Sequence, residues 1–482
     1  MTIRKAVAVV LAALMTAAFA MSEGAVAQKR MPGAAVGGGG GGGSGWHGGG
    51  GGGGAGLVGF GIGLATGIIA SQPPAQAAPQ VVDRPPRQSN NAPRRPSAVP
   101  PANERRYVPD EVLIEVPNSV PAATISEIET RFRLTRLDVQ PIPLLGSTFY
   151  RYRVPNGISV TRAVRALEGD RRIAFTQPNY LFTLQQAAES TAAPAKTYDP
   201  AQYAVAKMRL VEAHAIAKGD DIRVAVIDSG VDPEQPELAG AIADRFDTLS
   251  TPFAPHMHGT AIAALIAGHN KLMGSAPDAR ILAVRAFDPN GNAAEATTFN
   301  IIRAIDWSVT QRARIINMSF AGPADPGIHR ALEAAYKKNV VLIAAAGNAG
   351  AKSPPLYPAA DPNVIAVTAT DANDQLFKGS NRGRHVAVAA PGVDVLIAVP
   401  NGGYEVSTGT SFAAAEVSGI AALMLQRKTD LTPVAVRDAL LATAKDLGKK
   451  GRDDEFGAGI ADAYRAVTEL PGARISDAVP SR

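Results

Sequence analysis

Cysteine is absent from this chain of 482 residues. Its absence excludes disulfide bridges and every metal site that depends on thiolate ligands. The fold must therefore be stabilised by packing, together with any cations that bind to oxygen ligands. A chain of this length also exceeds one typical hydrophobic core, so we expect two or more folded units.

Over most of the chain, positive and negative charges nearly balance. The formal net charge is +5, but residues 28–106 alone carry +6 and residues 1–27 carry +1. This leaves −2 for residues 107–482. The basic balance therefore belongs to the N-terminal region, and nucleic-acid binding is not indicated.

The N-terminus lacks a hydrophobic run long enough to cross a membrane. Arg4 and Lys5 precede the apolar stretch 6–20, which is shorter than the ~20 residues that a transmembrane helix needs. An Ala-x-Ala site follows at residues 25–27. Against the alternative of an uncleaved anchor, this pattern predicts a cleavable signal peptide over residues 1–27 and an extracytoplasmic location, secreted or periplasmic.

Residues 28–106 lack the side chains from which a core is built. Residues 37–54 are almost pure glycine, and the part nearest residue 106 is rich in Pro, Ala, Asn and Arg, so we expect a disordered leader. Residues 57–70 are apolar, with a glycine at every fourth position from 59 to 67, a spacing that lets helices approach closely in membranes. We expect this segment to contact a membrane transiently; the alternative is a flexible spacer.

Three residues with catalytic chemistry stand in short motifs. Asp228 closes an apolar run, His258 stands in His-Gly-Thr, and Ser411 stands in Gly-Thr-Ser-Phe-Ala before the helix-like run 412–425. A serine at a helix start has backbone N–H groups and the positive dipole end beside its hydroxyl, which suits a nucleophile whose target oxygen becomes negative. Singly, each motif is typical of a turn or helix cap. Their order, Asp then His then Ser, is that of the subtilisin triad.

At these motifs the sequence resembles the subtilisin-like serine peptidases, or subtilases. The matching segments are Val-Ile-Asp-Ser-Gly-Val-Asp at 226–232, His-Gly-Thr at 258–260, Ala-Ala-Ala-Gly-Asn at 344–348 and Gly-Thr-Ser at 409–411. All four follow the family's order. The resemblance implies a peptidase domain over residues 199–470, with a tail over residues 471–482.

The resemblance implies a role for each catalytic residue. Ser411 would attack a peptide carbonyl, His258 would move the proton, and Asp228 would orient and stabilise the imidazolium. Asn348 would donate its side-chain N–H to the oxyanion. His256 lacks the motif that follows His258, so we interpret it as a loop histidine that is able to perturb His258.

Two segments depart from the family pattern. Ser319, Phe320, Ala321 and Gly322 occupy the substrate-cleft segment that usually reads Ser-Leu-Gly-Gly. The methyl group of Ala321 is therefore expected to narrow the primary specificity pocket. After the nucleophile stands Glu416, which we expect in the first helical turn, where its charge would favour the helix dipole.

The sequence predicts no metal site, and no cofactor is required for catalysis in this family. Residues 267–277 lie where some subtilases carry a calcium-binding loop, but they are few and offer only Asn270 as a side-chain oxygen ligand. Calcium takes several oxygen ligands. Structural calcium elsewhere in the chain stays open.

Strand-like and helix-like runs alternate through the peptidase region, which predicts an α/β fold with a parallel sheet and helices on both faces. Functional groups in such sheets gather at the carboxyl ends of the strands, where Asp228 and Asn348 stand. The strand-like runs are 222–227, 281–287, 315–320, 340–346 and 364–370, and the helix-like runs are 260–267, 295–309, 327–338 and 432–444.

Residues 107–186 predict a small α+β unit with the order β-α-β-α-β. This order, with Gln-Pro-Asn-Tyr at 177–180, resembles the inhibitory propeptide of subtilases, a ferredoxin-like fold whose C-terminal tail lies in the active-site cleft. An unrelated small domain is the alternative. Residues 187–198 then form a processing linker, with the maturation cut expected within 187–196. The predicted elements are strands at 111–116, 149–154 and 173–184 and helices at 122–132 and 160–167.

Two classes of function fit these observations. The first is a secreted serine endopeptidase that acts on polypeptides and is made as a self-processing zymogen, with its own propeptide as an intramolecular inhibitor. The second is an inactive binding protein that keeps the fold. The presence of Asp228, His258, Asn348 and Ser411 favours the first, since an inactive relative is free to lose any of them.

Overall fold

The computed structural model describes residues 97–185, 202–290 and 294–470. All of them belong to one compact unit, Asn90–Arg482. The predicted signal peptide, the leader up to residue 96, residues 187–198 and the tail lie outside the described residues. Within the described part of the chain, no helix is long and apolar enough to cross a membrane.

The described residues form a seven-stranded sheet in which all pairings are parallel. Its central strands are buried on both faces, which explains their continuous apolar sequences. The parallel sheet predicted from the sequence is confirmed. The order across the sheet is β13 (Val386–Pro391), β12 (Val364–Thr370), β11 (Val341–Ala345), β9 (Ile315–Met318), β5 (Arg223–Asp228), β7 (Arg280–Arg285) and β6 (Ile242–Asp247).

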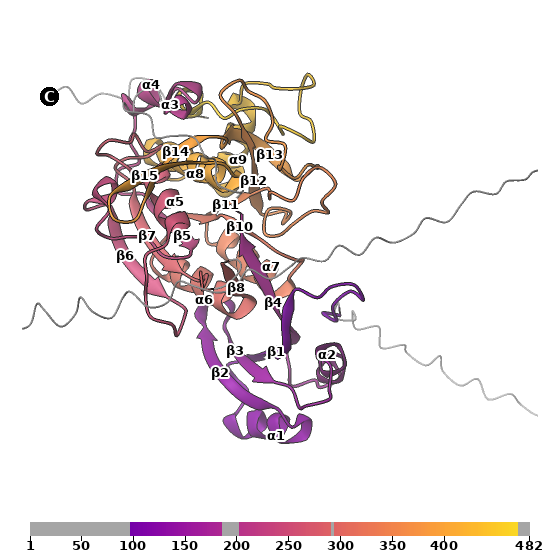
Figure 1. The fold of residues 1–482 in the computed structure, drawn as a ribbon. Coiled ribbons are helices and arrows are strands. Elements are labelled where there is room, and N and C mark those ends of the chain that lie inside the picture. The colour runs from indigo at the N-terminus through magenta and orange to yellow at the C-terminus, as the bar shows by residue number, and fades with distance from the viewer. Residues whose placement is uncertain (1–96, 186–201, 291–293, 471–482) are drawn as a thin grey trace, which may run out of the picture. The chain divides into compact units, whose positions relative to one another are not determined.

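Helices cover both faces of this sheet (Figure 1). Val224 and Val226 of β5 join the core on one face, whereas Ala225 and Ile227 join the core on the other, because successive strand residues point to opposite sides. The prediction of helices on both faces is thus confirmed. The first face carries α3 (Tyr203–Lys207), α4 (Leu210–His214), α5 (Met257–Ala267), α8 (Thr410–Arg427), α9 (Pro433–Thr443) and α10 (Ala463–Thr468), and the second carries α6 (Thr298–Thr310) and α7 (Pro326–Lys337).

The structure corrects the predicted helix 295–309. Its first residues form the short strand β8 (Glu295–Thr297), and α6 begins at Thr298, with Thr297 as its N-cap. The elements predicted from the sequence do not include β6, β13, the 3-10 turn η2 (Pro236–Leu238) or the hairpin of β14 (Val395–Val399) and β15 (Gly403–Ser407).

Residues 107–184 form a small α+β domain. Its order is β1-α1-β2-β3-α2-β4, and its strands pair in the order β4-β1-β3-β2, all antiparallel. The predicted order lacks β2, whose mixture of polar residues and proline hides the strand. The elements are β1 (Tyr107–Pro117), α1 (Ala122–Phe132), β2 (Thr135–Ile142), the 3-10 turn η1 (Pro143–Leu145), β3 (Ser147–Arg153), α2 (Val160–Glu168) and β4 (Phe175–Leu184).

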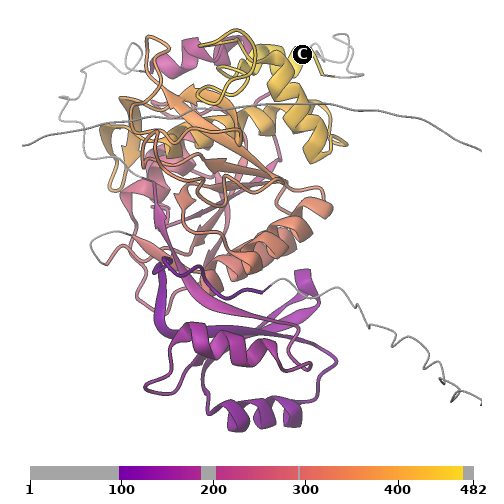
Figure 2. The ribbon, with the colours of Figure 1, turned by 90° about the vertical axis from the view of Figure 1, so that its right-hand side faces the viewer.

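Strand β4 belongs to both domains. Its last residues pair antiparallel with β8 on one side and with β10 (Phe320–Ala321) on the other. Figures 1 and 2 show β4 running out of the small domain toward the larger one. The small sheet also packs on the second face, where Leu113, Phe149 and Tyr180 join the core formed with α6 and α7.

Candidate active site

Asp228 and His258 meet at the carboxyl end of β5. Asp228 is the last residue of β5, and His258 lies in the first turn of α5. His258 Nδ1 is 2.9 Å from each carboxylate oxygen of Asp228, and both side chains are fully buried. Gly259 permits this approach, because a Cβ there would lie 2.4 Å from the carbonyl oxygen of Gly230.

Ser229 and His256 complete the surroundings of the Asp228 carboxylate. The backbone N–H and the hydroxyl of Ser229 lie 2.8 and 2.9 Å from Asp228 Oδ1. The same hydroxyl lies 2.7 Å from His256 Nδ1. His256 is the last residue of the loop before α5 and its half-buried N-cap, so the interpretation as a loop histidine is confirmed.

Ser411 occupies the N-terminus of α8, as its sequence context predicts. Its hydroxyl lies 2.6 Å from the carbonyl oxygen of Gln185, at the end of β4, and 3.3 Å from that of Ser319. The ring of the next residue, Phe412, lies 6.1 Å from the ring of His258. Within the described part of the chain, the buried Nε2 of His258 has no hydrogen-bond partner.

Asn348 is oriented by Thr410, the residue before Ser411. Its Oδ1 lies 3.1 Å from the backbone nitrogen and 2.8 Å from the hydroxyl of Thr410. This fixes Nδ2 toward Gln185, whose carbonyl oxygen is 2.9 Å away. Gly347, with φ 112°, makes this turn possible, because a Cβ there would lie 2.5 Å from Asn381 Nδ2. The structure therefore brings Asn348 and Ser411 to the same carbonyl oxygen.

The predicted cleft residues form one wall of the channel that holds β4. Ser319 accepts a hydrogen bond from Gln185 N at 3.1 Å, and β10 continues the pairing one residue further on. Gly322 is required here, because a Cβ would lie 2.3 Å from the ring of Phe182. Ala321 is buried and lines a pocket of about 460 Å³ together with Gln185; its effect on specificity stays a prediction.

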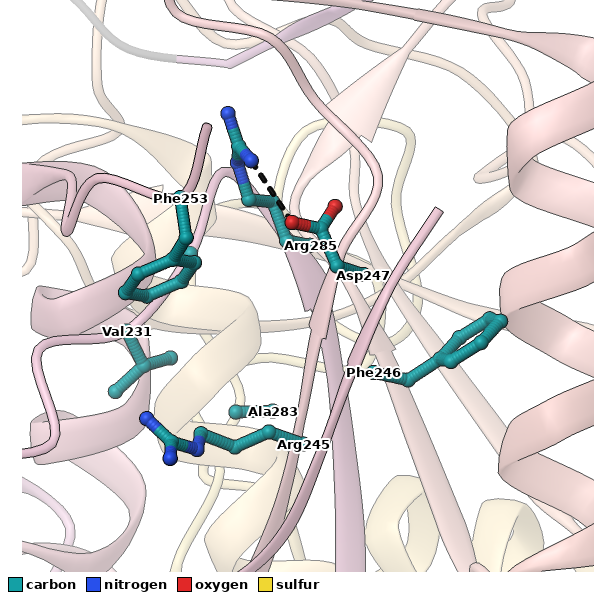
Figure 3. Close-up of a pocket in the computed structure, with 8 residues that line it drawn as sticks. Val231, Arg245, Phe246, Asp247, Phe253, Ala283 and Arg285 are labelled. Carbon is teal, nitrogen blue, oxygen red and sulfur yellow. Dashed lines mark hydrogen bonds and ion pairs between the residues drawn. The ribbon is translucent and has the colours of Figure 1, made fainter. Parts of the chain in front are cut away.

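A second pocket, of about 350 Å³, is lined by Val231, Phe253 and Arg285 among others (Figure 3). Arg285, the strand neighbour of Asp228, is buried in its wall and forms an ion pair with Asp247 at 2.8 Å. Arg285 also donates to the carbonyl and hydroxyl oxygens of Thr251, and its guanidinium lies 5.8 Å from the ring of Phe253. Sequence reasoning missed Arg285, because an arginine at a strand end normally indicates solvent exposure.

Glu416 differs from its prediction. Helix α8 begins at Thr410, so Glu416 lies beyond the first turn, and it is buried rather than solvated. Burial raises the pKa of Glu416 to about 8, and a hydrogen bond from Ser275 opposes the shift. A neutral acid at this position gives no favourable interaction with the helix dipole at neutral pH.

The loop after α5 surrounds a carboxylate that comes from η2. The buried carboxylate of Glu237 accepts hydrogen bonds from the backbone nitrogens of Asn270, Lys271 and Leu272 at 2.9–3.0 Å, and from the hydroxyl of Tyr404. The loop thus points its backbone N–H groups at the carboxylate, whereas a cation would require oxygen ligands in their place. Among the described residues, no cluster of three or more His, Cys, Asp or Glu could hold a metal ion.

Comparison with known proteins places this geometry in a family. A family model described as the subtilase family matches residues 219–459. Thermitase from Thermoactinomyces vulgaris is 35% identical over 274 residues, which cover 55% of this chain and 95% of that protein. The thermophilic serine proteinase of Bacillus sp. (strain AK1) is 31% identical over 371 residues, covering 75% and 88%.

Two further relatives are longer than the region they share with this chain. The minor extracellular protease Epr of Bacillus subtilis (strain 168) is 37% identical over 266 residues, which cover 54% of this chain but only 41% of Epr. The crystal structure of fervidolysin from Fervidobacterium pennivorans, a keratinolytic enzyme related to subtilisin, matches with a TM-score of 0.63 and 25% identity, covering 76% of this chain and 62% of that one. The chain therefore belongs to the subtilase family of serine endopeptidases.

Proposed function

We propose that this protein is an extracytoplasmic serine endopeptidase made as a self-processing zymogen, and that its first substrate is the bond after its own Gln185. One observation carries the proposal. The carbonyl oxygen of Gln185 lies 2.6 Å from Ser411 Oγ and 2.9 Å from Asn348 Nδ2. A scissile carbonyl requires these two neighbours, a nucleophile and an oxyanion donor.

The chemistry follows from these positions. Ser411 Oγ attacks the carbonyl carbon of Gln185, and its proton passes to His258 Nε2, which has no hydrogen-bond partner among the described residues and is therefore able to accept it. Asp228 holds the imidazole through Nδ1 and stabilises the imidazolium. Asn348 donates to the oxyanion. His258 then protonates the amine of the next residue in the chain, the peptide bond between residues 185 and 186 breaks, and water hydrolyses the acyl ester on Ser411. No step requires a metal or a cofactor.

The proposed cut, between residues 185 and 186, lies just outside residues 187–196, the segment in which the sequence analysis expects it. Residues 181–184 pair with β8 and β10, and Gln185 N bonds to Ser319. After cleavage, the tail of β4 keeps these bonds as a product in the cleft. The small domain then acts as an intramolecular inhibitor until it is degraded.

External substrates would bind as extended polypeptides in the place that β4 occupies between β8 and β10. In that strand Phe182 is the fourth residue before the cut, and its side chain is fully buried. Its ring packs edge-to-face on Phe320, with centroids 6.0 Å apart, and Phe320 in turn contacts Phe287 at 4.9 Å. We therefore propose a preference for an aromatic or large apolar side chain four residues before the cleaved bond.

The location and the leader belong to the same proposal. The signal-peptide pattern supports an extracytoplasmic location, and Epr is described as extracellular. The apolar segment 57–70 would give the precursor a transient membrane contact before maturation. Polypeptides are the proposed partners, and nucleic acids are not.

Expression of the Ser411→Ala variant in a protease-free host tests the proposal. The wild-type chain should mature, and mass spectrometry should find a new N-terminus at Gln186. Ser411→Ala should remain uncut and hydrolyse no peptide, with a loss of about 10⁶ in turnover, a magnitude known from within this family. Ser126→Ala, on an exposed turn of α1, is the matched control and should mature normally. Processing of Ser411→Ala at the wild-type rate would refute self-cleavage.

A binding protein without activity is the competing function. A serine-directed fluorophosphonate separates the two, because it bonds only to a serine that its histidine can activate. Labelling of Ser411 in the matured wild type supports the enzyme. A matured protein whose Ser411 stays unlabelled would be an inactive binder.

A further inference from the structure

A second histidine is connected to the catalytic pair through a single hydroxyl group. His256 Nδ1 lies 2.7 Å from Ser229 Oγ, and Ser229 Oγ lies 2.9 Å from Asp228 Oδ1. Asp228 in turn holds His258 at 2.9 Å. A continuous chain of four side chains therefore runs from His256 to the proposed general base, His258.

The hydroxyl of Ser229 has one proton, so it donates to only one of its two neighbours. A carboxylate accepts more strongly than a neutral imidazole, because charge-assisted hydrogen bonds are about twice as strong. The proton therefore lies between Ser229 and Asp228, and His256 donates its Nδ1–H to the Ser229 oxygen. A protonated Nδ1 has no lone pair with which to accept, so in this tautomer its 3.4 Å contact with the backbone N–H of His258 is not a hydrogen bond.

The loop that precedes His256 is held by Arg285, which lines the second pocket together with Phe253 of that loop (Figure 3). Arg285 donates to both oxygens of Thr251, five residues before His256. The ring of Phe253 stands over the same guanidinium, and a Cβ on Gly230 would touch this ring at 3.3 Å. His256 is thus held on a braced segment and does not depend on its own hydrogen bond for its place.

The charged groups that face His256 are few. Burial lowers the pKa of His256, the charge of Asp228 raises it, and His258 lowers it. Residues 249–255 of its own loop contain no titratable side chain, and Arg285 of β7 is paired with Asp247. His256 is therefore neutral at neutral pH, where it acts as a hydrogen-bond donor and not as a charge.

We propose that His256 is a positioning residue for the catalytic pair: by donating to the Ser229 oxygen it keeps the Ser229 hydroxyl directed at Asp228 Oδ1, and so fixes the carboxylate that holds His258. The other two donors to this oxygen are Ser229 N and His258 Nδ1. Without His256, the Ser229 hydroxyl is free to rotate away from Asp228, and the less compensated charge of the carboxylate attracts the imidazolium of His258 more strongly. This inference rests on the proposed peptidase activity.

Variants at His256 and Ser229 test the connection through kinetics on a synthetic peptide. His256→Ala should lower kcat about three- to tenfold with KM within about twofold, and should move the acid limb of kcat/KM to higher pH, because His258 is protonated more readily. Ser229→Ala should produce the same changes. Since His256 acts only through Ser229, adding His256→Ala to Ser229→Ala should change nothing further.

Two more variants serve as rescue and control. His256→Asn keeps an amide donor at similar reach and should restore kcat and the acid limb. His269→Ala, on the loop after α5, removes an exposed histidine that bonds only to backbone oxygens and should leave both unchanged. If His256→Ala lowers kcat by the same factor with and without Ser229, or lowers only the melting temperature, the proposal is wrong.

The Nδ1 proton of His258 gives a readout that does not depend on activity. Its low-field proton resonance reports the hydrogen bond to Asp228, and we expect it to shift in His256→Ala and Ser229→Ala but not in His269→Ala. An unshifted resonance in the first two would overturn the proposal. If the wild type neither hydrolyses peptides nor labels with a fluorophosphonate, the proposed function fails, while this resonance still decides the role of His256.

Discussion

Glu416 is a buried carboxylic acid on α8, the helix whose N-terminal turn contains Ser411. Burial raises its pKa to about 8, and Oε2 has no hydrogen-bond partner within the described residues. The unfolded chain has the ordinary value of 4.5. The folded protein therefore keeps a proton that the unfolded chain loses between these two values, so stability falls as the pH rises from about 4.5 to about 8.

We predict that Glu416→Gln stabilises the protein at neutral pH, because glutamine has the same shape without the ionisation. The gain should be roughly 1–3 kcal/mol at pH 7 and should shrink toward zero near pH 4.5. Urea unfolding of the Ser411→Ala precursor at pH 5, 6, 7 and 8 measures it. Glu405→Gln, on an exposed position of β15, is the control. A gain that does not depend on pH would contradict the assignment.

At the scale of elements, Glu237 orders the turn that follows α5. Its carboxylate receives three backbone N–H groups and one hydroxyl while buried. Removing the carboxylate would take an acceptor from these donors, at a cost of about 1–3 kcal/mol for each buried group that loses a hydrogen bond. A side chain on η2 therefore holds residues 270–272 in place.

Glu237→Ala should destabilise the protein by roughly 2–4 kcal/mol and should speed amide hydrogen exchange most at residues 270–272. Glu234→Ala, three residues earlier and exposed, should change neither. Chelation of calcium should leave exchange at 270–272 unaltered in the wild type. Faster exchange after chelation would mean that a cation, and not Glu237, holds the turn.

Elements whose sequence carries a local signal could be predicted. Strands β5, β9, β11 and β12 are mostly apolar because helices cover both of their faces. Asp228 and Asn348 were placed at strand ends by the same pattern. Strand β8 could not be predicted, since three residues become a strand only by pairing with β4. Helical spacing therefore assigned them to α6.

The candidate site likewise contains residues that a local sequence motif predicts and residues that only the fold brings into contact. Ser411, His258, Asp228 and Asn348 lie in motifs that the sequence displays. Gln185 has no motif, because its importance comes from the path of β4 and from two contacts more than 160 residues away along the chain. Arg285 and the cap role of His256 likewise depend on neighbours that only the fold brings together.

For the whole molecule, the small domain supplies caps to two helices of the larger one. Asn179 Oδ1 accepts from the backbone nitrogen of Phe299 at 3.2 Å, and Gln177 Oε1 accepts from that of Gly327 at 2.8 Å. Gln177 also donates to the buried Asp325, the N-cap of α7, at 2.9 Å. Helix starts leave such N–H groups unpaired, so the small domain recognises the larger one at defined points besides the cleft.

Residues 97–185, added as a separate polypeptide, should inhibit the matured enzyme competitively at micromolar concentration or below, because β4 would occupy the cleft. Phe182→Ala in that polypeptide should weaken inhibition by at least tenfold, or about 1.4 kcal/mol. Val139→Ala, at an exposed position of β2, should inhibit like the wild type. Inhibition constants measured against a peptide substrate decide this, and noncompetitive inhibition would exclude the cleft as the binding place.

Release of the small domain leaves two sheet edges facing each other. Strands β8 and β10 are three and two residues long, and each loses the partner that β4 supplied. Unpaired edge strands recruit an extended chain through backbone hydrogen bonds, which carry little sequence information. A protein entering between them must give up its own secondary structure over about five residues. The mature enzyme should therefore distinguish proteins by how readily they unfold locally, cutting denatured chains, chain ends and long loops and sparing intact helices and sheets.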